Sequence, residues 1–465
     1  MAGLRPATDV QRLRARRWDA IVLGTGITGL VAAARLGAAG HRVLVIEEDA
    51  ARGLHPALRE PFFLAGARDA GVVDACLREL NIPLIDQRRL AEERLAYQVT
   101  SSKLRMDVGG PGVTTEELDT WGLCDPEQAG VLVRAIVDAT EAERKVMLAS
   151  PLVRVGRRLS LARSGTPGSH VRGWPAEATP PSPELAAVLD AQVSALSNLA
   201  VAAPPPEARA RLLGASLAGG AGFGDGPPWL HGLLRRRVEA VYADFRTVAG
   251  RFDLVSVDHQ PGLVVESTNE LWVGRALLVA AAPSAVAAAL AGEPVPDFLA
   301  TARPRRRRIH AHLRVHRDVV PSGMCPRLVM MGEGSEERLE GRVVSVTAYA
   351  NPQSSDEVDL VGRIRIADGE DPALAEAEVL RRVRELMPFS DRRIALRAQR
   401  RPIWDDDGWL EDPDPGQSWP AEIDLRVSGR TPVYRLDRAG VACLGVEGDL
   451  LLGWRAGDAI AAELG

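Results

Sequence analysis

Lysine is nearly absent from this chain of 465 residues. Only Lys103 and Lys145 are lysines, so 55 of the 57 Lys and Arg side chains are arginine. Any lysine-based chemistry therefore has two candidates. The net charge is −5, and this balance gives no reason to expect nucleic acid as a partner.

Cysteines and long apolar runs are also scarce. The four cysteines lie far apart and form no C-x-x-C: Cys76, Cys124, Cys325 and Cys443. This spacing predicts buried thiols in a reducing compartment and argues against a disulfide framework or a zinc site. No apolar run reaches 18 residues, so neither a membrane span nor a signal peptide is expected. We expect a cytoplasmic protein.

Residues 1–17 contain no hydrophobic segment and are rich in arginine (Arg12, Arg14, Arg16, Arg17). We expect this leader to be a disordered, solvated tail. The alternative is a weak contact with anionic lipid, which would place the protein peripherally at the inner membrane.

What the chain does have is a strand, glycine turn, helix and second strand over residues 18–47. A short apolar run, 19–23, leads into Gly24-Thr25-Gly26-Ile27-Thr28-Gly29, a complete G-x-G-x-x-G. A small-residue helix (30–36) and a β-branched strand (42–46) follow. This context predicts a dinucleotide fold with the pyrophosphate at the helix N-terminus.

Glu47 ends the second strand, 18 residues after Gly29. A carboxylate there can accept hydrogen bonds from both hydroxyls of an adenosine ribose, and it would repel a 2′-phosphate. The pattern therefore favours FAD or NAD over NADP.

The rest of the chain is expected to alternate between this domain and a second one. Helices are predicted at 72–80, 114–152 (with a capping box from Thr114 to Glu117), 184–199, 206–217, 229–249, 284–290, 373–386 and 454–464. Strands are predicted at 95–108 (a hairpin turning at 101–102), 254–257, 262–266, 271–273, 275–283, 342–349, 360–366 and 441–444.

Strict alternation begins at Ile309, which places His310, His312, Arg314 and His316 on one face of a strand. We expect this face to be solvated. An anion or carboxylate clamp is the first alternative, and a metal site is the weaker one because no acidic or Cys ligand stands at a suitable spacing. The prediction is therefore no metal.

The whole plan resembles the group of FAD-dependent amine oxidases, phytoene desaturases and protoporphyrinogen oxidases. The resemblance rests on the glycine motif with Glu47, the run ALLVAAAP, the stretch VHRDVVPSGM (315–324) and the closing segment GVEGDLLLGWRAGDAIAAEL. Phytoene-desaturase-like members look closest. The group's Gly-Gly-Arg turn after the acid is missing, and only Arg52-Gly53 remains of it.

The resemblance implies an α/β fold: a Rossmann-like, GR2-type FAD-binding domain interleaved with a substrate domain of mixed antiparallel sheet and helices. The FAD-binding domain would comprise 18–85, 219–300 and 425–465, and the substrate domain 86–218 and 301–424. Besides the glycine motif and Glu47, it implies cofactor contacts from Glu48, Arg52, Leu254, Ala282 and one of Glu447 and Asp449. It assigns no catalytic residue.

The activity implied is an FAD-dependent oxidoreductase, in which hydride from a C–H or C–N bond of a small, apolar substrate passes to flavin N5. The electron acceptor would be O₂, a quinone or another molecule. Two alternatives stay open. One is an NAD-linked dehydrogenase, and the other is a non-catalytic carrier resembling the GDP-dissociation inhibitors.

Overall fold

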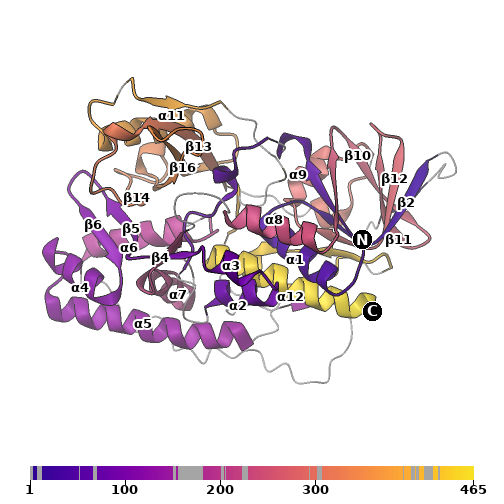
Figure 1. Cartoon of the computed structure of the whole chain (residues 1–465), viewed down its shortest axis with the longest axis horizontal. Helices are drawn as coiled ribbons and strands as arrows, with labels where there is room; N and C mark the ends of the chain where they lie inside the picture. The colour runs from indigo at the N-terminus through magenta and orange to yellow at the C-terminus, as the bar shows by residue number, and fades with distance from the viewer. Residues whose placement is uncertain are drawn as a thin grey trace.

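Two sheets of eight strands organise the protein (Figure 1). The computed structural model describes residues 4–7, 13–51, 53–65, 71–149, 153–155, 182–200, 204, 206–222, 229–292, 294–300, 306–390, 392–398, 404, 408–412, 423–427 and 430–465. The strands of the first sheet come from three separate stretches of sequence, and those of the second sheet come from the stretches between them.

The first sheet has the order β1-β10-β11-β12-β2-β3-β9, with β20 pairing β12. Its strands are β1 Arg5–Pro6, β2 Arg14–Leu23, β3 Val43–Glu48, β9 Asp244–Val248, β10 Phe252–Val257, β11 Gln260–Val265, β12 Glu270–Val279 and β20 Val433–Arg435. The contacts from β20 and β12 through β2 and β3 to β9 are parallel, whereas β10, β11 and β12 form an antiparallel meander. Parallel neighbours buried on both faces explain the continuous apolar runs in β2, β3 and β12.

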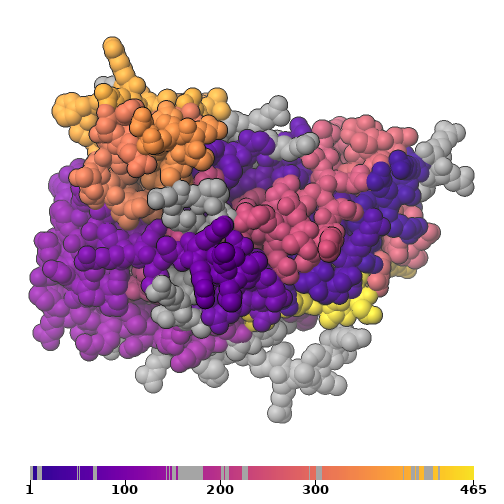
Figure 2. All heavy atoms as spheres, in the orientation of Figure 1, coloured from indigo at the N-terminus to yellow at the C-terminus, as the bar shows by residue number. Residues whose placement is uncertain are grey.

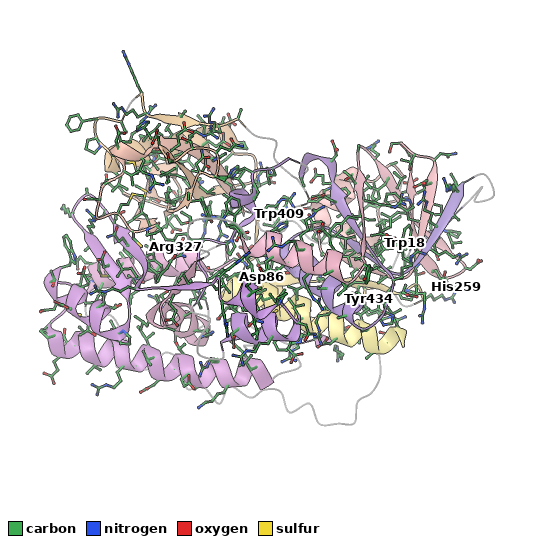
Figure 3. The ribbon with its side chains drawn as sticks, in the orientation of Figure 1. Trp18, Asp86, His259, Arg327, Trp409 and Tyr434 are labelled. Atoms are coloured by element: carbon green, nitrogen blue, oxygen red, sulfur yellow. The ribbon has the colours of Figure 1, made fainter. Side chains whose placement is uncertain are left out.

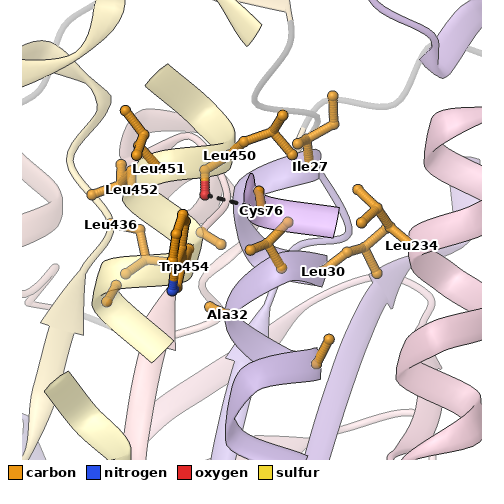
Figure 4. Close-up of a cluster of buried hydrophobic side chains, with 14 of the residues drawn as sticks. Ile27, Leu30, Ala32, Cys76, Leu234, Leu436, Leu450, Leu451, Leu452 and Trp454 are labelled. Carbon is orange, nitrogen blue, oxygen red and sulfur yellow. Dashed lines mark hydrogen bonds between the residues drawn. The ribbon is translucent and has the colours of Figure 1, made fainter. Parts of the chain in front are cut away.

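The helices α1 (Ile27–Ala38) and α12 (Val446–Leu464) lie side by side against this sheet, with α8 (Leu230–Ala240) on the other side of α1 (Figure 1). Small residues permit the close approach of α1 and α12. A Cβ on Gly453 would lie 2.5 Å from the Thr28 carbonyl oxygen, and one on Gly457 would lie 2.6 Å from the Cβ of Arg35. Figure 4 shows the apolar cluster that seals this contact.

The second sheet has the order β17-β13-β16-β15-β14-β5-β6, with β18 pairing β13. Its strands are β5 Leu95–Thr100, β6 Arg105–Gly109, β13 Arg306–His316, β14 Arg327–Met330, β15 Val344–Ala350, β16 Glu357–Ala367, β17 Ile394–Leu396 and β18 Trp409–Leu410. The helix α11 (Pro372–Leu386) covers β13 and β16. These C-terminal strands and α11 form the upper left of the face in Figure 2, apart from the strands of the first sheet on the right.

Four helices, α4 Pro111–Thr120, α5 Pro126–Ala149, α6 Pro183–Leu196 and α7 Pro206–Leu217, lie beside β5 and β6 (Figure 1). The other elements are short: α2 Val72–Glu79, α3 Leu84–Gln87, α9 Pro283–Ala289, α10 Asp297–Ala300, β4 Ala91–Glu93, β7 Val153–Arg154, β8 Gly220–Gly222 and β19 Ile423–Asp424. None of the described helices is long and apolar enough to cross a membrane.

Two long helices predicted from the sequence are shorter in the structure, and the one predicted over 114–152 is divided into α4 and α5. The predicted capping box is wrong, because α4 begins at Pro111 and Thr114 therefore lies inside the helix. The Thr114 hydroxyl forms hydrogen bonds with the backbone of Gly109, just before the helix. The helix predicted over 229–249 ends at Ala240. Tyr242 has φ +61°, and the chain then enters β9 beside β3.

The two ends of the chain also differ from expectation. Arg14, Arg16 and Arg17 belong to β2, whose first half pairs with β12, so this part of the leader is not a solvated tail. The strand predicted at 441–444 is a 3-10 turn, Ala442–Leu444. The last helix begins at Val446, eight residues before the predicted start, and takes in the segment predicted to be a turn.

Candidate functional site

The glycine turn between β2 and α1 depends on close backbone packing. Gly24 has φ +110°, and a Cβ there would lie 2.8 Å from the Ala281 amide nitrogen. A Cβ on Gly29 would lie 2.7 Å from the Gly24 carbonyl oxygen. Gly26 is the N-cap of α1 and provides no side-chain hydrogen bond to the first turn. The first N–H groups and the positive end of the helix dipole are thus arranged as an anion site.

The turn also contains a buried hydroxyl without a hydrogen bond. Thr28 is buried, and its Oγ1 has no hydrogen-bond partner among the described residues. A buried hydroxyl in this condition costs free energy. A polar group bound at the N-terminus of α1 would supply the missing partner.

Glu47 is buried at the end of β3, where two arginines contact the same oxygen. Its Oε1 lies 3.2 Å from Arg59 Nη2 and 3.1 Å from Arg235 Nη1. Glu47 also lines a cavity of about 440 Å³ together with Phe245 and Trp272. The structure therefore places the predicted ribose ligand at the wall of a cavity with aromatic sides.

Arg59 and His231 were not predicted as site residues. Arg59 is buried, and His231 Nε2 lies 3.2 Å from its Nη1 and 2.8 Å from the Thr25 carbonyl oxygen. Burial, followed by the charge of Arg59, lowers the pKa of His231 to about 3. The neutral ring donates to Thr25 and so connects α8 to the glycine turn. Local sequence gave no signal for this, because the three segments meet only in the folded chain.

The other predicted contacts lie in different surroundings. Glu48 accepts a hydrogen bond from the Trp404 N–H at 2.8 Å. Ala282 is buried at the N-cap of α9, one residue after the Ala281 backbone that faces Gly24. Leu254 is buried in the core cluster of the first sheet. Arg52 lies outside the described residues.

Glu447 and Asp449 are both buried in the first turn of α12, and each is paired with an arginine. Both carboxylate oxygens of Glu447 lie 2.6 Å from Arg211 Nη2. Asp449 accepts from Arg438 Nε at 2.8 Å and Nη2 at 2.7 Å, and from Asn198 Nδ2 at 3.1 Å. These pairs fix the start of α12 in the protein interior.

A cavity lies between the helices packed on the first sheet and the strands of the second sheet. Its wall includes Ile27 of α1, Val446 of α12, Phe62 from the segment after β3, and Arg308 and His310 of β13. The glycine turn, the last helix and the second sheet therefore converge on one space. Two groups in its wall could contact a bound molecule: the N-terminus of α12, at Val446, and the imidazole of His310 on β13.

His310 is held neutral in this cavity. Burial, together with the charges of Arg363 and Arg308, lowers its pKa well below the ordinary value. Arg308 donates to the Ser197 carbonyl oxygen at 2.7 Å, and Arg363 Nη2 donates to the Glu60 carbonyl oxygen at 2.9 Å. The two guanidinium groups are thus fixed in place beside a neutral imidazole.

A larger cavity of about 510 Å³ shares Glu60, Pro61 and Phe62 with the first. Apolar and charged side chains both line it: Phe62, Trp229, Met324, Tyr349, Val358, Glu93, Arg317 and Arg327. Arg327 pairs with Glu93 and donates to the carbonyl oxygens of Ala96 and Ala221. Figure 3 shows it in the half of the molecule away from Trp18 and Tyr434.

The histidine-bearing face of β13 is not the solvated surface that was expected. His310 lines the cavity, and His312 is buried against Asp359 at 2.8 Å. Only His316 is exposed, and it contacts Asp318. The prediction is wrong for His310 and His312 because β13 is an inner strand facing α6 and the segment after β3.

Comparisons with known proteins identify the fold. Residues 22–57 match the NAD(P)-binding Rossmann-like domain family. No curated protein matches the chain. Cyclohexylamine oxidase from Brevibacterium oxydans IH-35A superimposes with a TM-score of 0.56 at 16% identity, covering 97% of this chain and 100% of the other. The chain has the amine-oxidase fold.

Putrescine oxidase bound to putrescine gives a TM-score of 0.55 at 14% identity, over 96% of this chain and 100% of the other. An oxidoreductase from Methanosarcina mazei gives 0.54 at 14% identity, over 94% and 99%. These likenesses confirm the predicted Rossmann-like domain and the interleaved second sheet. The preference for phytoene-desaturase-like members stays a prediction.

Proposed function

We propose that the protein is an FAD-dependent oxidoreductase. The observation that carries this proposal is that two sites suited to the two ends of FAD lie on either side of the glycine turn. Glu47 and the aromatic walls of its cavity suit an adenosine. At the other end, Ile27 and the start of α12 share a cavity with His310.

The residues present suit FAD. The backbone of the glycine turn and the Thr28 hydroxyl would hold the pyrophosphate, Glu47 would hold the ribose, and the N-terminus of α12 would face the flavin ring. When bound, FAD supplies a hydride acceptor at N5. The protein contributes orientation, a water-poor cavity and fixed charges.

We assign a substrate-positioning role to His310, because it is the neutral imidazole in the cavity wall. The neutral ring would form a hydrogen bond with a substrate N–H or O–H group, while burial and the charges of Arg308 and Arg363 keep it unprotonated. Phe62 lines both this cavity and the larger one.

The larger cavity is the proposed substrate site. Phe62, Trp229 and Met324 suit an apolar substrate body, and the Glu93–Arg327 pair suits a polar group at one end. We therefore propose that hydride leaves a C–H bond, next to nitrogen or within an apolar chain. We propose O₂, a quinone or another molecule as the electron acceptor.

The test starts from the purified full-length chain. We expect a yellow protein that releases FAD on heating, and bleaching of the flavin when amines or unsaturated apolar compounds are added without oxygen. A His310→Gln variant should retain FAD but bleach more slowly. A colourless protein that fails to take up added FAD would contradict the proposal. Release of NAD would favour the dehydrogenase, and bound FAD that no compound bleaches would favour a carrier.

A further inference from the structure

Three potential metal ligands from distant parts of the sequence meet beside the second sheet. They are His55, His312 and Asp359, and their ligand atoms all lie within 4.8 Å of one another. His312 stands opposite Val361 in the β13–β16 ladder, so Asp359 is its diagonal neighbour on the same face. The third ligand, His55, comes from the segment between β3 and the 3-10 turn Pro56–Arg59.

The distances suit one small cation. His312 Nε2 lies 2.8 Å from Asp359 Oδ1, and His55 Nε2 lies 3.7 Å from Asp359 Oδ2. The two imidazole rings stack with their centres 4.6 Å apart. Ligand atoms about 2.0–2.1 Å from a tetrahedral zinc ion are roughly 3.3 Å from one another. The observed distances of 2.8 and 3.7 Å lie on either side of that value, so small side-chain rotations would bring the three ligand atoms to the spacing of a zinc site.

A buried polar atom without a partner points to a missing ligand. The Asp359 side chain is 1% exposed, yet among the described residues its Oδ2 has no hydrogen bond. His55 Nδ1 is likewise buried without a partner. Unsatisfied buried oxygens and nitrogens are costly. Both atoms belong to the same cluster, and one cation would satisfy the carboxylate oxygen.

We propose that His55, His312 and Asp359 bind a divalent transition-metal ion, with Zn²⁺ the best match to two imidazoles and one carboxylate. The His55 side chain is 26% exposed, which leaves an approach for the ion and for water as the fourth ligand. The ion would connect the segment that carries Arg59, the partner of Glu47, to the second sheet. It would thus stabilise the packing of the segment after β3 against the second sheet.

The positive charge of Arg314 lies beside Asp359 and would repel a bound cation. Its Nε lies 3.7 Å from Asp359 Oδ1 and 3.5 Å from Glu357 Oε2, without a hydrogen bond to either. When the ion binds, the guanidinium would turn toward Glu357. Removing this charge should therefore tighten metal binding.

Isothermal titration of chelator-treated, full-length protein with ZnCl₂, and visible absorption after addition of Co²⁺, test the site directly. We expect one ion per chain and a Co²⁺ spectrum with nitrogen ligands. Asp359→Asn and His55→Gln should each weaken binding at least about tenfold. Arg314→Gln should strengthen it. His316→Gln is the matched control, because His316 forms the other His–Asp contact of β13 but is exposed.

Absence of a Zn²⁺ heat signal in the wild-type chain, or an equal loss in the His316→Gln control, would overturn the proposal. Circular dichroism checks that each variant folds. If the ligand variants fail to fold, the Arg314→Gln titration still decides, since unchanged or weaker binding there contradicts the arrangement. FAD content is measured separately, so failure of the metal site leaves the proposed flavin function intact.

Discussion

The buried pair between Arg211 and Glu447 offers a sharp test of how the start of α12 is held. Both residues are buried, and a single guanidinium nitrogen contacts both carboxylate oxygens at 2.6 Å. Replacing Arg211 with methionine keeps most of the volume but leaves the Glu447 charge unpaired. Replacing both residues, in Arg211→Met with Glu447→Gln, removes the charge as well.

The expected loss of unfolding free energy follows from the burial of Glu447, whose charge remains when Arg211 is replaced. Breaking a buried pair by removing one partner typically costs about 3–5 kcal/mol. Glu447 is in the first turn of α12, where the helix dipole favours a negative charge by up to about 1 kcal/mol. We therefore expect Arg211→Met to lose about 3 kcal/mol of unfolding free energy. The double variant should recover about 2 kcal/mol of that loss.

Urea unfolding followed by tryptophan fluorescence measures these differences. Arg209→Met on the same helix is the control, because its partner Asp190 is 45% exposed and such pairs contribute less than about 1 kcal/mol. If the double variant is no more stable than Arg211→Met, the unpaired charge is not the cause of the loss. A control as damaging as Arg211→Met would refute the reasoning from burial.

Three further predictions concern the glycine turn and its surroundings. Glu47→Gln should weaken FAD retention about tenfold, measured by equilibrium dialysis, and undiminished retention would count against the ribose role. Gly24→Ala should lower unfolding free energy by roughly 2–4 kcal/mol, whereas Gly40→Ala, with φ +89° but open space around it, should lose much less; equal losses would mean that the close backbone approach is unimportant. Burial raises the pKa of Glu60 from 4.5 to about 7, so the folded protein keeps a proton that the unfolded chain has lost. Stability from this group is complete below pH 4.5 and falls by about 3 kcal/mol as pH rises to 7; unfolding curves for Glu60→Gln should lack this component, and an identical pH profile in the variant would show that Glu60 is not its source.

Local patterns predicted the parts of the fold in which neighbours in sequence are neighbours in space. The turn from β2 to α1 and the hairpin of β5 and β6 were found because their signals lie within a few residues. The same reasoning failed for β9. Its residues continue the helical pattern of α8, and only the parallel edge of β3 makes them a strand.

The candidate site shows more clearly that local sequence patterns do not predict contacts between distant segments. The place of Glu47 at the end of β3 was predicted correctly, because its distance from the glycine turn is set by one crossover. Its partners Arg59 and Arg235 were not, since nothing in a chain with 55 arginines distinguishes those that become buried. Periodicity correctly placed the histidines of β13 on one face but could not show what covers that face.

What covers it decides the chemistry. His310 meets the cavity at the last helix, whereas His312, two residues along the same face, meets an acid from β16 and a histidine from the segment after β3. The objection that no acidic ligand stands at a suitable spacing holds for His310 and His312 along the sequence but fails across the ladder, because β16 brings Asp359 to the diagonal position. A face with one pattern thus provides two kinds of site. The proposed redox and metal sites can therefore be disabled separately, by His310→Gln and by Asp359→Asn.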